Sequence, residues 1–233
     1  MTKPFKNRIL FLITFLLTTS LFAQPDIKSF SFKKGEILDI LLLTTKPDTK
    51  QNFERYKETI FPVGIKKTFQ PLPGFKISKT IQGNIQPTSF ILGKWKDLKN
   101  REEFLSEIEG IVPDFHKQRR DLWSVFNLTY YEIPKDISFK IDKNKYTVAT
   151  SYWKKDDIRF EKFINLWQQK TTSKGGTKIL ELTNGKSPLG YYHNPDLLVI
   201  TQWNSKEEFD AFYKENLKMD HNGVLHVNQF VLN

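Results

Sequence analysis

The chain has 233 residues, a formal net charge of +10 and no cysteine. Without cysteine there is no disulfide framework, no thiolate nucleophile and no cysteine-ligated zinc or iron–sulfur site. Hydrophobic residues make up 39% of the chain and charged residues 27%, with 11 glycines and 11 prolines. This composition is that of a globular protein with one large domain or two small ones.

Residues 1–23 have the pattern of a secretory signal peptide. Three basic residues precede an uncharged, mainly apolar run over residues 9–23, which ends at Ala23. The run is shorter than the ~20 residues that a membrane-spanning helix needs. We therefore predict cleavage after Ala23 and a periplasmic or secreted protein that has no membrane partner after cleavage.

The basic charge of the remaining chain is dispersed. Removal of the three basic residues of the predicted signal lowers the net charge from +10 to +7. The other lysines and arginines occur as scattered pairs and form no run of five or six like charges. We therefore expect no nucleic-acid partner.

Several sequence motifs recur at a spacing of 105 to 108 residues. The matching pairs are Phe53-Glu54-Arg55-Tyr56 with Phe160-Glu161-Lys162-Phe163, Asn100-Arg101-Glu102-Glu103-Phe104 with Ser205-Lys206-Glu207-Glu208-Phe209, Trp95 with Trp203, and His116 with His221. A period this long indicates duplicated domains rather than a solenoid. We predict two homologous modules, residues 36–133 and 146–233, joined by a linker at 134–145.

The first module is predicted to run strand, helix, strand, strand, helix, strand. The strands are expected at residues 36–45, 75–83, 90–96 and 125–133. Asp48 is the expected N-cap of the first helix, which should end at Pro62 and Gly64. Asn100 and Glu103 are expected to form a capping box that opens the second helix.

The second module is predicted to repeat this order. Its strands are expected at residues 146–153, 178–183, 197–203 and 225–232. One helix should run from Asp157 to Gly175, and Ser205 with Glu208 should cap the other.

The predicted fold class is α+β. An antiparallel sheet with both helices on one face leaves its other face to be covered. Two such sheets in one chain can cover each other, so we predict two tandem ferredoxin-like (βαββαβ) modules that form an intramolecular α+β barrel. Tyrosine and tryptophan have apolar bodies and polar groups, and several are expected to line the space between the sheets.

The same features resemble the dimeric α+β barrel superfamily. A strand opens with Pro73-Gly74-Phe75, a later strand ends at Trp95, and an acidic helix leads to His116; the second module has Trp203 and His221 in the same pattern. Within the superfamily the chain is similar to the antibiotic biosynthesis monooxygenase (ABM) family and its EthD-like and NIPSNAP-like relatives. The resemblance implies a module that normally pairs in a homodimer. Its known activities include cofactor-independent oxidation of polyphenols and haem degradation.

The haem-degrading relatives use an asparagine, a tryptophan and a histidine. His116 and His221 match the histidine. The asparagine and tryptophan positions are nearest Ile40 and Glu107 in the first module, and Ala149 and Phe212 in the second. Two of the three signature residues are missing from each half, so we predict no cofactor, with a haem-sized cavity as the alternative.

His116 and His221 are the predicted catalytic residues. An imidazole can transfer protons near neutral pH or ligate iron. The alternative is that each histidine lies at a helix end and interacts with the last carbonyl groups. No metal site is predicted, because the spacing of His221 and His226 fits no established zinc motif.

Four further residues are predicted to bind the ligand. Trp95 and Trp203 are expected to shape the cavity, and the alternative is that they pack between strand and helix. Tyr192 and His193 are expected to lie at its edge, and the alternative is an ordinary turn between strands.

The sequence therefore predicts an exported ABM-like barrel that binds a small apolar or aromatic molecule and oxidises it as a cofactor-independent monooxygenase. The alternative is a non-catalytic periplasmic module that binds a small molecule or haem. Whether the protein is an enzyme, and whether it is a monomer or a homodimer, stays open.

Overall fold

The computed structural model describes residues 26–188, 191 and 193–233. The predicted signal peptide and Tyr192 lie outside these residues. No helix in the described part of the chain is long and apolar enough to cross a membrane.

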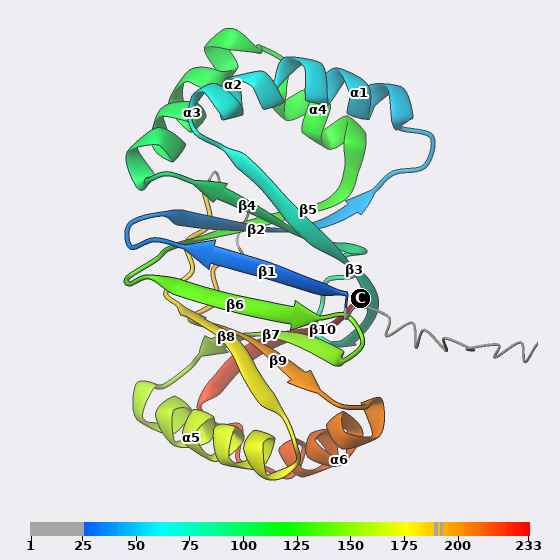
Figure 1. The fold of residues 1–233 in the computed structure, drawn as a ribbon, viewed down its shortest axis with the longest axis vertical. Coiled ribbons are helices and arrows are strands. Elements are labelled where there is room, and N and C mark those ends of the chain that lie inside the picture. The colour runs from blue at the N-terminus through cyan, green and yellow to red at the C-terminus, as the bar shows by residue number, and fades with distance from the viewer. Residues whose placement is uncertain (1–25, 189–190, 192) are drawn as a thin grey trace, which may run out of the picture.

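The fold is mixed α+β, with a large antiparallel sheet between two layers of helices (Figure 1). The strands are β1 Ile27–Phe32, β2 Ile37–Thr45, β3 Gln70–Gln82, β4 Ser89–Trp95, β5 Trp123–Glu132, β6 Ile137–Asp142, β7 Tyr146–Lys154, β8 Thr177–Thr183, β9 Leu197–Trp203 and β10 Val224–Leu232. The helices are α1 Lys50–Thr59, α2 Phe61–Lys66, α3 Leu98–Ile111, α4 Phe115–Leu122, α5 Asp157–Ser173 and α6 Lys206–Asn216. Helices α1 to α4 lie at one end of the molecule, and α5 and α6 lie at the other (Figure 1).

Eight strands form one continuous sheet in the order β5-β2-β4-β3-β10-β7-β9-β8. Strands β3 and β10 join the two halves, with Phe230 paired to Thr80. The edge strand β5 also meets the segment that follows β8, because Tyr130 and Lys186 exchange backbone hydrogen bonds of 2.8 and 3.0 Å. The sheet therefore curls so that its β5 edge meets, at one isolated bridge, the segment that follows its other edge strand, β8.

The space inside the curled sheet is filled by the chain's own side chains. A single cluster of buried residues takes members from both halves of the sheet. Its aromatic members are Phe30, Phe32, Phe75, Phe90, Tyr131, Phe139 and Phe230. Protein interiors pack as densely as organic crystals, so this cluster is the structural core of the barrel.

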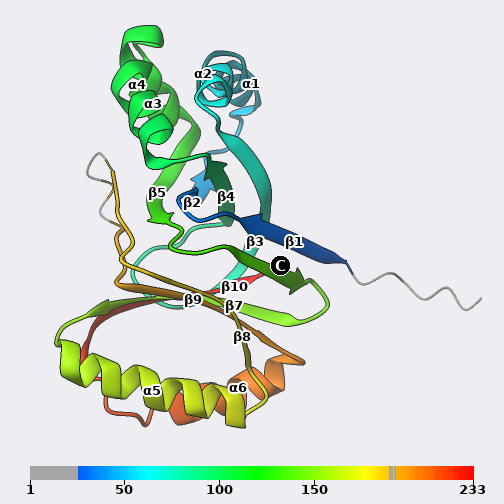
Figure 2. The same cartoon turned by 60° about the vertical axis from the view of Figure 1, so that its left-hand side comes forward.

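The predicted linker at residues 134–145 is partly wrong, because it contains β6. This strand pairs with β1, another strand that the sequence analysis missed, and places Phe30 opposite Phe139. The β1–β6 ribbon extends the β2–β5 ladder and lies between the two halves (Figure 2). Buried Phe32 and Phe139 point into the core while their neighbours are exposed, as the two-residue period of a strand requires.

The first helix region also differs from the prediction. Pro62 does not end it, because a second helix, α2, begins at Phe61 and has Pro62 in its first turn. Proline is tolerated there because the first N–H groups of a helix have no partner within the helix. The interruption expected around Pro62 is therefore a break between two helices.

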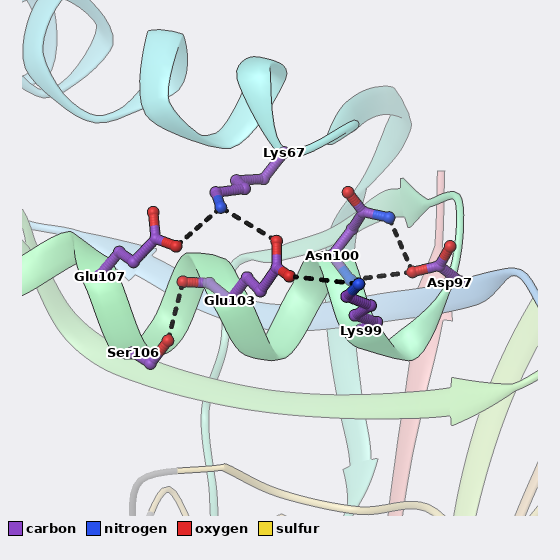
Figure 3. Close-up of polar contacts among 7 residues, drawn as sticks. All are labelled: Lys67, Asp97, Lys99, Asn100, Glu103, Ser106 and Glu107. Carbon is purple, nitrogen blue, oxygen red and sulfur yellow. Dashed lines mark hydrogen bonds and ion pairs between the residues drawn. The ribbon is translucent and has the colours of Figure 1, made fainter.

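Helix α3 starts one turn earlier than predicted. Its N-cap is Asp97, whose carboxylate accepts the Asn100 backbone N–H at 2.8 Å, so the predicted capping box at Asn100 is wrong (Figure 3). Lys67, after α2, reaches Glu103 at 3.0 Å and Glu107 at 2.8 Å and so ties α2 to α3. In the second half, Ser205 accepts the Glu208 N–H as predicted.

Candidate functional site

A cavity of about 300 Å³ lies between helices α1 to α4 and strands β2 to β5. Side chains alternate along β2, so Asp39, Leu41 and Leu43 face this cavity while Ile40 and its even-numbered neighbours face the barrel core. Phe53, a lining residue that is 40% exposed, marks an opening to solvent. The cavity expected between the two sheets is therefore wrong, because that space is packed and the observed cavity lies on the opposite face of the sheet.

Larger side chains fill the corresponding space in the second half. Leu43 pairs with Ser89 across β2 and β4, whereas Tyr152 pairs with Leu197 at the same place in β7 and β9. At both positions the second half has the larger side chain. This difference in size explains why the space between the helices and the sheet is filled in the second half.

The helices show the same contrast. Ile60 lies eleven residues after the N-cap of α1, and Trp167 lies eleven residues after the N-cap of α5. Trp167 is only 1% exposed and packs edge-on against Phe212, with 5.8 Å between ring centroids. In the second half, Trp167 therefore fills the space under α5. The corresponding space in the first half, beside Ile60, remains open.

A buried polar cluster forms one wall of the cavity. Asp39 accepts a hydrogen bond from Trp95 Nε1 at 2.8 Å and another from Arg101 Nε at 2.8 Å. Arg101 is 1% exposed, and its guanidinium stacks on the Tyr130 ring at 3.9 Å from the centroid. Both carboxylate oxygens are engaged, so the charges of Asp39 and Arg101 compensate each other.

Trp95 lines this cavity, whereas Trp203 lies among the packed side chains of the second half. The indole N–H of Trp203 donates to Thr201 at 3.2 Å, two residues earlier on the same strand. The residue two before Trp95 is Gly93, which has no hydroxyl. Trp95 therefore depends on Asp39 for its hydrogen-bond acceptor.

Arg119, on α4, forms part of another wall and is 8% exposed. Its Nε is 3.4 Å from the Tyr56 hydroxyl, and its Nη1 donates to the Tyr191 hydroxyl at 3.0 Å. Burial by itself lowers the pKa of Arg119, but the two tyrosine hydroxyls outweigh it and raise the pKa above its usual value. The guanidinium is therefore charged at any physiological pH.

Asp39, Arg101 and Arg119 were not predicted from the sequence as members of the site. One signal was available for Asp39, because it is a lone acid within the apolar strand sequence ILDILLL. A charged residue in a strand that is buried on both faces requires a partner. No comparable signal marked Arg119, which lies in a polar helix whose buried face is set by the packing of α4 against α1.

The two predicted catalytic histidines do not come together. His116, near the start of α4, has a side chain that is 32% exposed and lies 2.8 Å from Glu109 Oε1. His221 lies in the turn before β10, beside the Phe163 ring. Helix α4 lies in the helix layer of the first half, and the turn before β10 follows α6 in the second half, at the other end of the molecule (Figure 1). Neither histidine lines the cavity. A catalytic role for either one stays a prediction.

His116 and His221 also occupy different structural settings. The N-caps Asp97 and Ser205 are 108 residues apart, as are Trp95 and Trp203, so corresponding positions here differ by 108 in number. The two histidines are only 105 apart, which is three residues, or about one helical turn, too few. Helix α4, which carries His116, follows α3, whereas a turn without a helix leads from α6 to β10.

His193 is buried rather than at the edge of the cavity. Its Nδ1 lies 2.7 Å from the Thr129 hydroxyl, and its Nε2 has no partner among the described residues. Burial lowers its pKa to about 4, so the ring is neutral at neutral pH. Tyr192 lies outside the described residues, and the ligand-binding roles of both residues remain predictions.

The lining of the cavity does not fit haem. Haem iron takes a histidine, cysteine, methionine or tyrosine ligand. None of the described residues that line the cavity is a histidine or methionine, and the hydroxyl of the lining Tyr56 is engaged by Arg119. Elsewhere in the described part of the chain, no group of three or more histidine and acidic residues is placed to hold a metal ion.

Comparison with known proteins supports the fold alone. No protein-family model matches the chain, and no curated protein matches its sequence. Chlorite dismutase from Candidatus Nitrospira defluvii, solved in complex with imidazole, aligns with a TM-score of 0.51 at 8% identity, over 87% of this chain and 92% of that one. An anthrone oxidase-like protein aligns with a TM-score of 0.46 at 14% identity, over 88% and 94% of the two chains.

Proposed function

We propose that this protein is an exported α+β barrel that binds a small apolar or aromatic molecule in the cavity between helices α1 to α4 and the sheet. The observation that carries the proposal is the cavity of about 300 Å³ in the first half. Binding sites for small molecules are concave and mainly apolar, with a few convergent polar groups. The mainly apolar lining, with Asp39, Arg101 and Arg119 in its walls, has this character.

The contrast between the halves supports a binding role. Close packing is the rule in protein interiors, and in the second half Tyr152, Trp167 and Leu197 fill the space that corresponds to the cavity. The second half does have a more open pocket beside α5 and β8, lined mainly by polar residues. The first half has smaller residues at the corresponding positions, and its cavity opens to solvent beside Phe53. A ligand would fill this space.

The duplicated architecture is part of the proposal. Both halves have the order strand, helical segment, strand, strand, helical segment, strand. The N-caps of the first helices are 107 residues apart, and those of the later helices are 108 apart. These regular offsets support two tandem ferredoxin-like modules of the ABM type, in which the space under the helices stayed open in one copy and the corresponding space became filled in the other.

Oxidation of the ligand is a further part of the ABM resemblance. A cofactor-independent oxygenase needs a group that removes a proton from its substrate. Asp39 is the carboxylate in the cavity wall, and both of its oxygens already accept hydrogen bonds. The geometry therefore favours binding over catalysis as the function of this site.

Filling the cavity is expected to weaken binding. In the variant Ser89→Leu/Ile60→Trp, each new side chain copies the residue at the corresponding position of the second half. Calorimetric titration with 2-naphthamide, a neutral two-ring probe, should show binding to the wild type and at least a roughly tenfold weaker affinity for the variant.

The control for the serine-to-leucine change is Ser138→Leu, which makes the same substitution at an exposed position of β6. It should bind 2-naphthamide as the wild type does. The proposal fails if the wild type binds neither 2-naphthamide nor its carboxylate analogue 2-naphthoate, or if the filled variant binds as tightly as the wild type.

A further inference from the structure

The surroundings of Arg119 are built to hold a guanidinium in a fixed place. Its Cζ lies 4.0 Å from the centroid of the Phe115 ring and 4.6 Å from that of Phe126. Tyr56 on α1 and Tyr191 in the segment between β8 and β9 supply the two hydroxyl contacts. Residues from both halves of the chain therefore position this side chain, which also lines the cavity.

The cavity wall carries an excess of positive charge. Asp39 pairs with Arg101 at 2.8 Å, and Glu102, which does not line the cavity, lies 3.3 Å from the same guanidinium. No salt bridge joins Arg119 to a carboxylate in residues 26–188, 191 and 193–233. A buried charge without a counter-ion is costly, because neutral hydroxyls replace only part of its hydration. An anion in the cavity would supply the missing charge.

The donors of Arg119 fit a carboxylate. A guanidinium has five N–H groups in a planar fork that matches the two oxygens of a carboxylate. The Tyr56 and Tyr191 hydroxyls engage Nε and Nη1, and no hydrogen bond to a described residue engages Nη2. Carboxylates are ionised at neutral pH, whereas most phenols are not.

The size and lining of the cavity define the rest of the ligand. A cavity of about 150 Å³ is enough to hold benzene, so about 300 Å³ suits a body of two fused rings. Phe53, Phe61 and Phe104 are among the aromatic residues of the lining. Their rings can pack against an aromatic ligand.

We propose that the cavity binds a small aromatic monocarboxylate, with the carboxylate paired to Arg119 and the rings against the apolar lining. This inference rests on the proposed binding function and adds the chemical class of the ligand. Arg119 is then the residue that determines specificity for an anion over a neutral molecule of the same shape.

The test compares 2-naphthoate with its neutral counterpart 2-naphthamide by calorimetric titration of the full mature chain. The wild type should bind 2-naphthoate at least about tenfold more tightly, since a charge-assisted pair is stronger than a neutral hydrogen bond. Arg119→Met should lose this preference and still bind 2-naphthamide. Arg120→Met, the same change at the exposed neighbouring residue, should keep the preference.

The outcomes separate this inference from the proposed function. Equal affinity of the wild type for the two probes, or a preference that survives in Arg119→Met, overturns the anion site and leaves the binding function standing. A wild type that binds neither 2-naphthamide nor 2-naphthoate overturns both. Arg119→Lys provides a second variant should Arg119→Met not fold. Because lysine retains the positive charge without the planar fork of N–H donors, its preference for 2-naphthoate over 2-naphthamide should be weaker than that of the wild type.

Discussion

Replacement of Asp39 by alanine is expected to lower the free energy of unfolding by about 3–5 kcal/mol, the usual cost of removing one partner of a buried ion pair. Arg101, which is 1% exposed, would lose its 2.8 Å partner and keep only the exposed carboxylate of Glu102, at 3.3 Å from Nη1. Trp95 would lose its hydrogen-bond acceptor as well. Urea denaturation of the variant and the wild type measures this loss.

The second half provides the control for this prediction. Val148 and Phe209 stand at the positions that correspond to Asp39 and Arg101, judged from strand register and from the distance to the N-cap. The double variant Asp39→Val/Arg101→Phe should therefore regain the part of the lost stability that comes from the buried charge, because apolar residues of suitable size often replace a buried ion pair without cost. The loss of the Trp95 hydrogen-bond acceptor should remain. An Asp39→Ala protein within about 1 kcal/mol of the wild type would contradict the assigned role of the pair.

Replacement of Phe32 by alanine is expected to lower the free energy of unfolding by about 3–5 kcal/mol, as is usual for a large aromatic residue in a core. Phe32 is 1% exposed and stacks on Phe139, with 6.3 Å between the ring centroids. The prediction follows from the β1–β6 ribbon being part of the barrel core. Thermal or urea denaturation measures the effect.

Ser31 is the matched control for Phe32, because it is the adjacent residue of β1 and is exposed. Ser31→Ala should change the free energy of unfolding by no more than about 0.5 kcal/mol. A similarly small effect of Phe32→Ala would show that the ribbon is a loose appendage and that the barrel interior is closed by other residues.

Sequence patterns predicted most of the sheet because strand and capping signals are local. Strand β9 was predicted at its observed bounds, and Ser205 was identified as an N-cap. Helix α2 was missed because Pro62 normally signals an end, and its tolerance in a first turn depends on where the preceding helix stops. The short strands β1 and β6 were missed because each gains its stability from pairing with a strand that is far away in the sequence.

The site was harder to predict because it depends on packing between distant segments. Trp95 was correctly placed near the end of its strand, and it does line a cavity. The histidines were chosen from a match that was one helical turn out of register, which the observed N-cap Asp97 corrects. The position of Arg119 depends on Tyr56 and Tyr191, which are 63 and 72 residues away from it in the sequence.

We propose above all that the ligand binds in the first half, under helices α1 to α4. Intermolecular NOEs between 2-naphthoate and the methyl groups of the protein test it most directly. We expect NOEs to Ile91, which lines the cavity, and none to Val199, its counterpart in the second half, or to Ile200 in the barrel core. NOEs to Ile200 or Val199 in place of Ile91 would contradict it.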